Sequence, residues 1–284
     1  MPRIHPAVRA AFRVTGRVAP PLALAASYRA FRTIGAPAPV RTADRAVHER
    51  ARRGELRVAG ERVVTYAWGD PAGDPVLLVH GWRSRASRFA RLVETLERSG
   101  RHVLAYDAVA HGDSTGRYTT ILDHLAIMRR IADDAGPLAG IVGHSFGALA
   151  AGTAVTEGVD AATYTAVAAA PSFDALNDGF VRAIDLPATL HDRHARRVAT
   201  RLFPDEPDPA ARFDLFRHPV AAPALFVHGS RDREIPPASS RALHAAHPGS
   251  RLVEPDAGHN GVLDAPETLG AVLGHVTAGA VNSA

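Results

Sequence analysis

The sequence predicts an α/β fold with a mostly parallel sheet and helices on both of its faces. Short apolar runs alternate with helical segments from residue 76 to 170, and the same alternation returns after residue 223. Parallel strands need helical crossovers between them, so this rhythm is typical of a doubly covered parallel sheet. The first two strand-like runs instead join around Gly60, which predicts an antiparallel hairpin.

Eight strands and five core helices follow from this pattern. The expected strands are 56–59, 62–68, 76–79, 102–106, 138–142, 164–169, 224–227 and 251–254. The expected helices are 86–99, 119–134, 146–156, 238–246 and a last one from about Val262.

Two segments depart from the rhythm and define the predicted organisation. Residues 171–222 are charged and helix-like, which indicates an insertion, and residues 1–53 form an arm rich in Arg and Ala. The α/β core is therefore expected to comprise residues 54–170 and 223–284.

Charge and composition exclude several classes of protein. The sequence pI is near 10, but all 33 basic residues are Arg and 12 of them lie in residues 1–60 beside only three acidic residues. The rest of the chain is mildly acidic, so we expect no nucleic-acid partner. Cysteine is absent, which excludes disulfides and thiolate chemistry.

The basic arm has apolar residues near helical spacing, which predicts an amphipathic helix that packs on the rest of the chain. A weak membrane-surface contact through residues 1–50 and a cleaved signal are the alternatives. Pro20 and Pro21 interrupt the only apolar stretch, 18–26, so a cytoplasmic location is expected.

A candidate nucleophile lies in Gly143-His144-Ser145-Phe146-Gly147. This five-residue pattern alone is weak evidence, but here a predicted strand precedes it and a small-residue helix follows it. That context is typical of a nucleophile elbow, in which a sharp turn projects the serine hydroxyl above the sheet.

A serine hydroxyl needs a base, and the base needs an orienting acid. In a nucleophile-elbow enzyme these partners follow the serine in chain order, on loops after later strands. Asp232 follows strand 224–227 and His259 follows strand 251–254, so we expect Asp232 as acid and His259 as base. Glu254 or Asp256 could supply a displaced carboxylate instead.

The developing oxyanion needs N–H donors fixed in advance. The residue after the nucleophile, Phe146, supplies one at the start of its helix. Trp82, in the loop after strand 76–79, is the candidate for the second.

Together these residues resemble the α/β-hydrolase superfamily, in its capped serine hydrolase or esterase branch, over residues 56–277. The resemblance is carried, in the family's order, by His80-Gly81-Trp82, Tyr106-Asp107 through Ser114, the elbow at Ser145, and Asp232 with His259. It implies that residues 171–222 form a small helical cap. Ala110 departs from the family, which usually has Gly at this turn position.

The resemblance implies hydrolysis of a carboxylic ester or thioester through an acyl-enzyme. Lactone, amide or carbon–carbon hydrolysis, perhydrolysis, or a non-catalytic ligand receptor on the same fold are the alternatives. Apolar residues of the insertion are expected to bind the small-molecule substrate: Phe173, Leu176, Phe180, Leu190, Phe213 and Phe216.

Other polar residues are assigned structural roles. Asp107 is expected to hold loops, and His80, His111 and His144 to pack or orient them. His191 with His194, and His244 with His247, have helical spacing but no third ligand, so no metal is expected. No cofactor motif is present.

Overall fold

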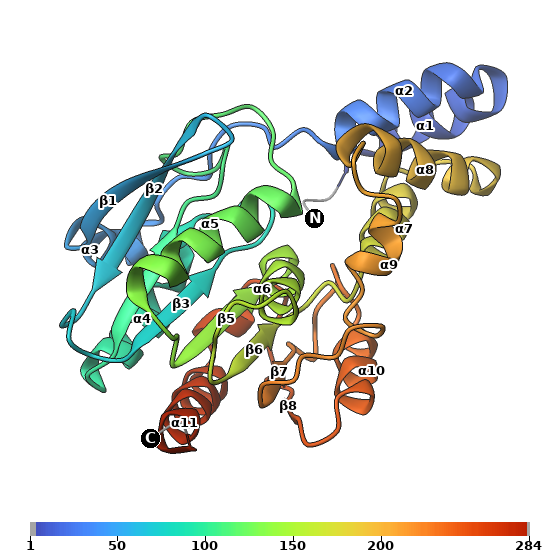
Figure 1. Ribbon diagram of the computed structural model, residues 1–284. Coiled ribbons are helices and arrows are strands. Elements are labelled where there is room, and N and C mark those ends of the chain that lie inside the picture. The colour runs from blue at the N-terminus through green and yellow to red at the C-terminus, as the bar shows by residue number, and fades with distance from the viewer. Residues whose placement is uncertain (1–3, 283–284) are drawn as a thin grey trace. The chain divides into compact units, whose positions relative to one another are not determined.

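The computed structural model describes residues 4–282 as parts of two compact units (Figure 1). Unit 1 joins the N-terminal segment through Thr33 with Ser172–Asp214, and unit 2 joins Ile34–Pro171 with the chain from Leu215 onward. Residues 34–53 of the predicted arm therefore fold with unit 2. Residues 1–3 of that arm lie outside the described residues.

Unit 2 is built on an eight-stranded sheet in the order β1-β2-β4-β3-β5-β6-β7-β8. β1 and β2 form the predicted antiparallel hairpin, β2 is antiparallel to β4, and all remaining pairs are parallel. The predicted α/β class is thereby confirmed. The strands are β1 Arg52–Val58, β2 Glu61–Trp68, β3 Pro75–Val79, β4 His102–Tyr106, β5 Gly140–His144, β6 Tyr164–Val167, β7 Ala224–Val227 and β8 Arg251–Val253.

Helices of unit 2 pack on the sheet because its central strands are apolar on both faces. Val76 and Leu78 of β3 join one core with α4 and α11, whereas the alternating Leu77 and Val79 point to the other side. α5 packs against α6, which covers β5 and β6. The helices are α3 Arg45–Glu49, α4 Ala90–Arg98, α5 Ile121–Ala135, α6 Phe146–Thr156, α10 Ala238–Ala246 and α11 Pro266–Asn282, with 3-10 turns η1 Thr42–Asp44, η2 Ala86–Phe89 and η4 Gly261–Asp264.

β5 extends two residues beyond the predicted strand, to His144. Gly143 pairs with Ala166 and His144 with Val167, so the parallel ladder with β6 continues up to the turn. The strand and α6 therefore leave a single residue, Ser145, between them.

Unit 1 consists of helices (Figure 1). They enclose a small apolar core of their own. Its helices are α1 Pro6–Val18, α2 Pro20–Phe31, α7 Phe173–Ala183, α8 His191–Leu202 and α9 Pro209–Arg212, with η3 Ala188–Leu190. Ala19 separates the two N-terminal helices: α1 ends at Val18 and α2 begins at Pro20. A buried hydrogen bond of 2.9 Å joins Ser27 Oγ of α2 to His194 Nδ1 of α8, and Phe180 stacks on the His194 ring.

The turn after β4 in unit 2 is organised by the buried carboxylate of Asp107. It accepts hydrogen bonds from the Ala86 N–H, the Tyr66 hydroxyl and the Arg85 guanidinium. Asp107 thus has the loop-holding contacts that its sequence context indicates. Ala110 in this turn has φ 64°, a conformation that favours glycine, which explains why the family pattern has Gly there.

Gly112 in the same turn gives a test of this network. It has φ +50°, and a Cβ there would overlap the Asp107 carboxylate, whereas Gly100 has φ +81° with open space around it. Gly100→Ala should cost about 1 kcal/mol of unfolding free energy from backbone strain alone. Gly112→Ala should cost about 3 kcal/mol or more, because it also displaces a buried, hydrogen-bonded charge. Equal losses in urea unfolding of the two variants would contradict this account.

Candidate active site

The turn between β5 and α6 holds Ser145 in an unusual backbone conformation. Its φ is 56° and ψ is −121°, a region that non-glycine residues rarely adopt. The turn is fixed by the Ser145 N–H, which donates to Val167 O at 2.9 Å, and by Ser145 O, which accepts from the Ala148 N–H at 3.0 Å. The surrounding ladder and helix therefore impose the strain.

Glycines on both sides of the turn are required by close packing. A Cβ on Gly143 would overlap the backbone of Gly147 and Ala148, and one on Gly147 would overlap the carbonyl oxygens of Val79 and His80. A Cβ on Gly81 would lie 2.9 Å from the Ser145 Cβ. The loop after β3 is thus pressed directly against Ser145.

The structure brings together the three residues that the sequence singles out. His259 Nε2 lies 3.0 Å from Ser145 Oγ, and His259 Nδ1 lies 2.7 Å from Asp232 Oδ2. A carboxylate can only accept, so Nδ1 carries the proton and Nε2 is left to accept from the Ser145 hydroxyl. All three residues belong to unit 2.

Asp232 is held ionised by an unusually complete set of donors. Oδ1 accepts hydrogen bonds from the N–H groups of Glu234 at 2.7 Å and Ile235 at 3.1 Å. Oδ2 accepts from His259 Nδ1 and also lies 3.1 Å from His228 Nε2. Burial acts to raise the pKa of this carboxyl, but the hydrogen bonds from His228 and His259 outweigh it and hold the pKa well below the usual range. The carboxylate is therefore charged at neutral pH.

His228 is a site residue that the sequence analysis did not assign. Its side chain is buried at the end of β7, and its Nε2 faces two acceptors, Asp232 Oδ2 and Ile235 O at 3.0 Å. Nε2 therefore carries the proton, and Nδ1 accepts from the Ser240 hydroxyl at 2.7 Å. The signal available in the sequence was the segment His228-Gly229-Ser230-Arg231-Asp232. In it, a histidine directly follows the predicted strand 224–227 and lies four residues before the acid.

Two more contacts surround the base. The His144 Nε2–H donates to the backbone oxygen of His259 at 2.9 Å, consistent with the loop-orienting role expected for His144. Glu234 Oε2 lies 3.9 Å from His259 Nε2, and the sequence analysis did not single it out either. The alternative carboxylates point elsewhere, since Glu254 pairs with Arg241 and Asp256 with Arg231.

Trp82 and Phe146, the expected oxyanion donors, lie on the two loops that Gly81 and Gly147 press together. Their rings meet edge-on at 5.8 Å. Neither backbone N–H donates a hydrogen bond to any residue that the structure describes. Both donors are therefore free for an oxygen atom brought to Ser145.

Two neutral histidines fix the loop that carries Trp82 to the turn after β4. His80 Nε2 accepts from the Ala108 N–H at 3.0 Å, and His111 Nε2 accepts from the Arg83 N–H at 3.0 Å. Burial lowers the pKa of His80 to about 4 and that of His111 to about 3. As uncharged rings they accept where an imidazolium could only donate.

The six apolar residues expected to bind substrate fall in different places. Phe180 and Leu190 lie in the core of unit 1, where Phe31 contacts the Phe180 ring edge-on at 5.1 Å. That packing accounts for the apolar character of these two side chains without a ligand. Phe173 and Phe213 are buried around Phe203, Leu176 is half-buried, and Phe216 of unit 2 is 40% exposed. A substrate-binding role for the set stays a prediction.

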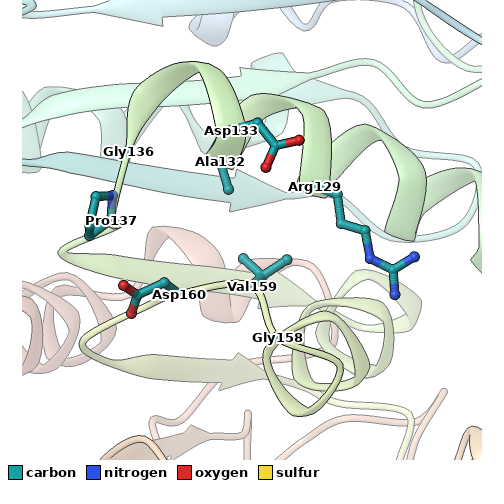
Figure 2. Close-up of a pocket in the computed structure, with 8 residues that line it drawn as sticks. All are labelled: Arg129, Ala132, Asp133, Gly136, Pro137, Gly158, Val159 and Asp160. Atoms are coloured by element: carbon teal, nitrogen blue, oxygen red, sulfur yellow. The ribbon is translucent and has the colours of Figure 1, made fainter.

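A separate hollow of about 250 Å³ lies at the amino ends of β5 and β6 (Figure 2). Gly136 and Pro137 precede β5, and Val159 and Asp160 precede β6, so they mark the amino ends of these strands. Ser145 follows the carboxyl end of β5. This hollow is therefore distinct from the Ser145 site.

The chain is similar in sequence and in fold to several known proteins. The model of a family described as the alpha/beta hydrolase family matches residues 76–272. Human "Serine hydrolase-like protein" is 34% identical over 103 residues, which cover 34% of this chain and only half of that protein. An esterase from Pyrococcus furiosus superposes with a TM-score of 0.64 at 19% identity, covering 87% of this chain and 97% of that one. A thioesterase domain from the curacin biosynthetic pathway superposes with a TM-score of 0.60 at 17% identity, and the match covers 80% of this chain and 99% of that one.

The buried histidines predict a loss of stability in acid. Burial lowers the pKa of His80, His111 and His144 from 6.5 to about 4, 3 and 3, so the folded chain keeps them neutral while the unfolded chain binds protons below pH 6.5. Their contribution is present above pH 6.5 and is lost as pH falls toward the folded pKa values.

His111→Gln isolates one of these groups. It should shrink the loss of unfolding free energy between pH 7 and pH 5 by up to about 2 kcal/mol, because one buried titrating group is removed. Asp232 does not interfere, since its lowered pKa makes its own contribution disappear only below 3.8. An unchanged pH dependence in urea unfolding would contradict the assignment.

Proposed function

Because the chain belongs to the alpha/beta hydrolase family, we propose that it is a serine hydrolase that cleaves a carboxylic ester or thioester through an acyl-enzyme. The observation that carries the proposal is the line of hydrogen bonds from Ser145 Oγ through His259 to Asp232, with distances of 3.0 and 2.7 Å. A nucleophile, a base and an orienting acid in this order are what acyl transfer requires.

In the acylation step, Ser145 Oγ attacks the acyl carbonyl carbon while His259 Nε2 takes the hydroxyl proton. The carbonyl oxygen becomes an oxyanion and accepts from the N–H groups of Trp82 and Phe146, which have no other partner among the described residues. The tetrahedral intermediate then collapses as His259 returns the proton to the leaving alcohol or thiol.

In the deacylation step, water repeats the sequence. His259 Nε2 removes a proton from a water molecule as its oxygen attacks the acyl carbon, and the Ser145 oxygen leaves with the proton that His259 returns. The products are the free acid and the regenerated serine. Asp232 stays ionised throughout and stabilises the transient imidazolium.

His228 acts in this scheme as a positioning residue. It touches no reacting atom, but with the N–H groups of Glu234 and Ile235 it fixes the Asp232 carboxylate toward His259.

Replacing the nucleophile tests the proposal directly. Ser145→Ala should reduce turnover of a chromogenic short-chain ester by about 10⁴-fold or more, since among the described residues no other hydroxyl is hydrogen-bonded to His259 Nε2. Ser230→Ala, a change at an exposed serine, is the matched control and should leave turnover unchanged. A fluorophosphonate probe should label the native chain and fail on Ser145→Ala. Full turnover or labelling without Ser145 would refute the mechanism, and no labelling of the native chain would favour a non-catalytic receptor.

The positioning role of His228 gives a second test. His228→Leu should lower kcat about ten- to a hundredfold, the scale expected when a residue that orients a reactive group is lost. His228→Gln, which keeps a donor, should recover part of this loss. An undiminished kcat in His228→Leu, or no recovery in His228→Gln, would contradict the positioning role.

A further inference from the structure

Helix α1 of unit 1 carries an apolar stripe that is open to solvent. Ala7, Ala11, Val14 and Val18 recur at helical spacing on one face, and all four are exposed, Val14 by 56% and Val18 by 77%. Leu22, in the first turn of α2, is 63% exposed. Of the six large apolar side chains exposed in the described part of the chain, four lie between Val8 and Leu22. Such clustering marks an interaction surface, unlike scattered exposed residues.

The stripe is not the face by which α1 packs in unit 1. Gly16 is buried against Pro187 and Leu190, and the half-buried Phe12 joins the same core. Both lie on the far side of the helix from Val14 and Val18. The helix therefore has two apolar faces, and only one is used for folding.

A row of arginines runs along α1 between the stripe and the packing face. Arg9, Arg13 and Arg17 follow each other at intervals of four residues, and the sequence contains no Asp or Glu before Asp44. Asp185 accepts from the Arg13 Nε at 2.9 Å and approaches Arg9, so one carboxylate serves this row. This side of the helix is therefore net positive.

A second basic feature lies in the same unit, between α2 and α8. A hollow of about 440 Å³ is lined by Leu24 and Thr200 together with Arg193, Arg196, Arg197 and Arg201. None of these six described residues is acidic. Arg193, Arg196 and Arg201 are exposed and Arg197 is half-buried, although α8 buries His194 and Val198. Guanidinium groups bind phosphate through paired hydrogen bonds, so the hollow suits a phosphate-bearing headgroup.

We propose that unit 1 docks on the surface of an anionic phospholipid membrane. Val14, Val18 and Leu22 enter the boundary between headgroups and acyl chains, and the arginines of α1 and α8 bind lipid phosphates. Among residues 4–282 no helix is long and apolar enough to cross a membrane, so the contact lies along the surface. A nucleic-acid backbone would satisfy the arginines but leave the apolar stripe in water, which is why a lipid surface fits better.

Vesicle flotation with the full-length chain tests this docking. The native protein should float with phosphatidylcholine vesicles that contain phosphatidylglycerol and should bind pure phosphatidylcholine far more weakly. Val14→Glu with Val18→Glu, and separately Arg196→Glu with Arg197→Glu, should each weaken binding about tenfold or more, because each removes one of the two contributions.

Matched controls lie in unit 2. Tyr118→Glu removes an exposed apolar side chain, and Arg91→Glu with Arg98→Glu reverses two exposed charges on α4; both should bind as the native chain does. Circular dichroism confirms that each variant folds, and turnover of a water-soluble ester tests the serine mechanism separately. Absent binding, equal binding to neutral vesicles, or losses no larger than those of the controls would overturn the proposal. Tight binding to duplex DNA that ignores Val14 and Val18 would assign the surface to nucleic acid instead.

Discussion

The geometry of the candidate site depends on the turn at Ser145, where a non-glycine residue is held at φ 56°. Strain of this kind persists only when the structure around it leaves no alternative. Here the β5–β6 ladder fixes the chain up to His144, α6 begins at Phe146, and the glycines at 143 and 147 allow backbone contacts that a methyl group would prevent. Because the same packing presses the loop after β3 against the turn, one constraint places both the serine hydroxyl and the N–H groups of Trp82 and Phe146, which have no partner among the described residues.

Charge in the site is arranged around this fixed point by burial and hydrogen bonding. Asp232 is kept ionised by donors that include His228, while the loop-holding histidines are kept neutral by burial. In the mechanism that we propose, this arrangement leaves His259 to exchange a proton with Ser145, 3.0 Å from its Nε2. Catalysis of acyl transfer depends on such preorganised dipoles, which need not rearrange as charge develops.

Local pattern was enough to predict much of the fold. β4, α6, β7 and α10 have the bounds expected from apolar periodicity and turn residues, and the strand-turn-helix context indicated Ser145. Asp232 and His259 could be inferred because each follows a predicted strand, and the two come after Ser145 in the order acid and then base. The role of His228 could not be inferred from the sequence, because its contacts with Asp232 and Ser240 depend on how the loop after β7 folds back. The packing of Phe180 and Leu190 in unit 1 was missed for the same reason, because sequence periodicity shows that a side chain is buried but not against what.

The most direct test of the account is to trap the covalent intermediate. The native chain would be mixed with an activated ester, quenched in acid within the first turnover, and digested for mass mapping. The account predicts that the peptide carrying Ser145 gains the mass of the acyl group, and that the gain disappears when excess time allows deacylation. Rapid ester hydrolysis with no acylated peptide, or with the acyl group on another residue, would contradict the central claim.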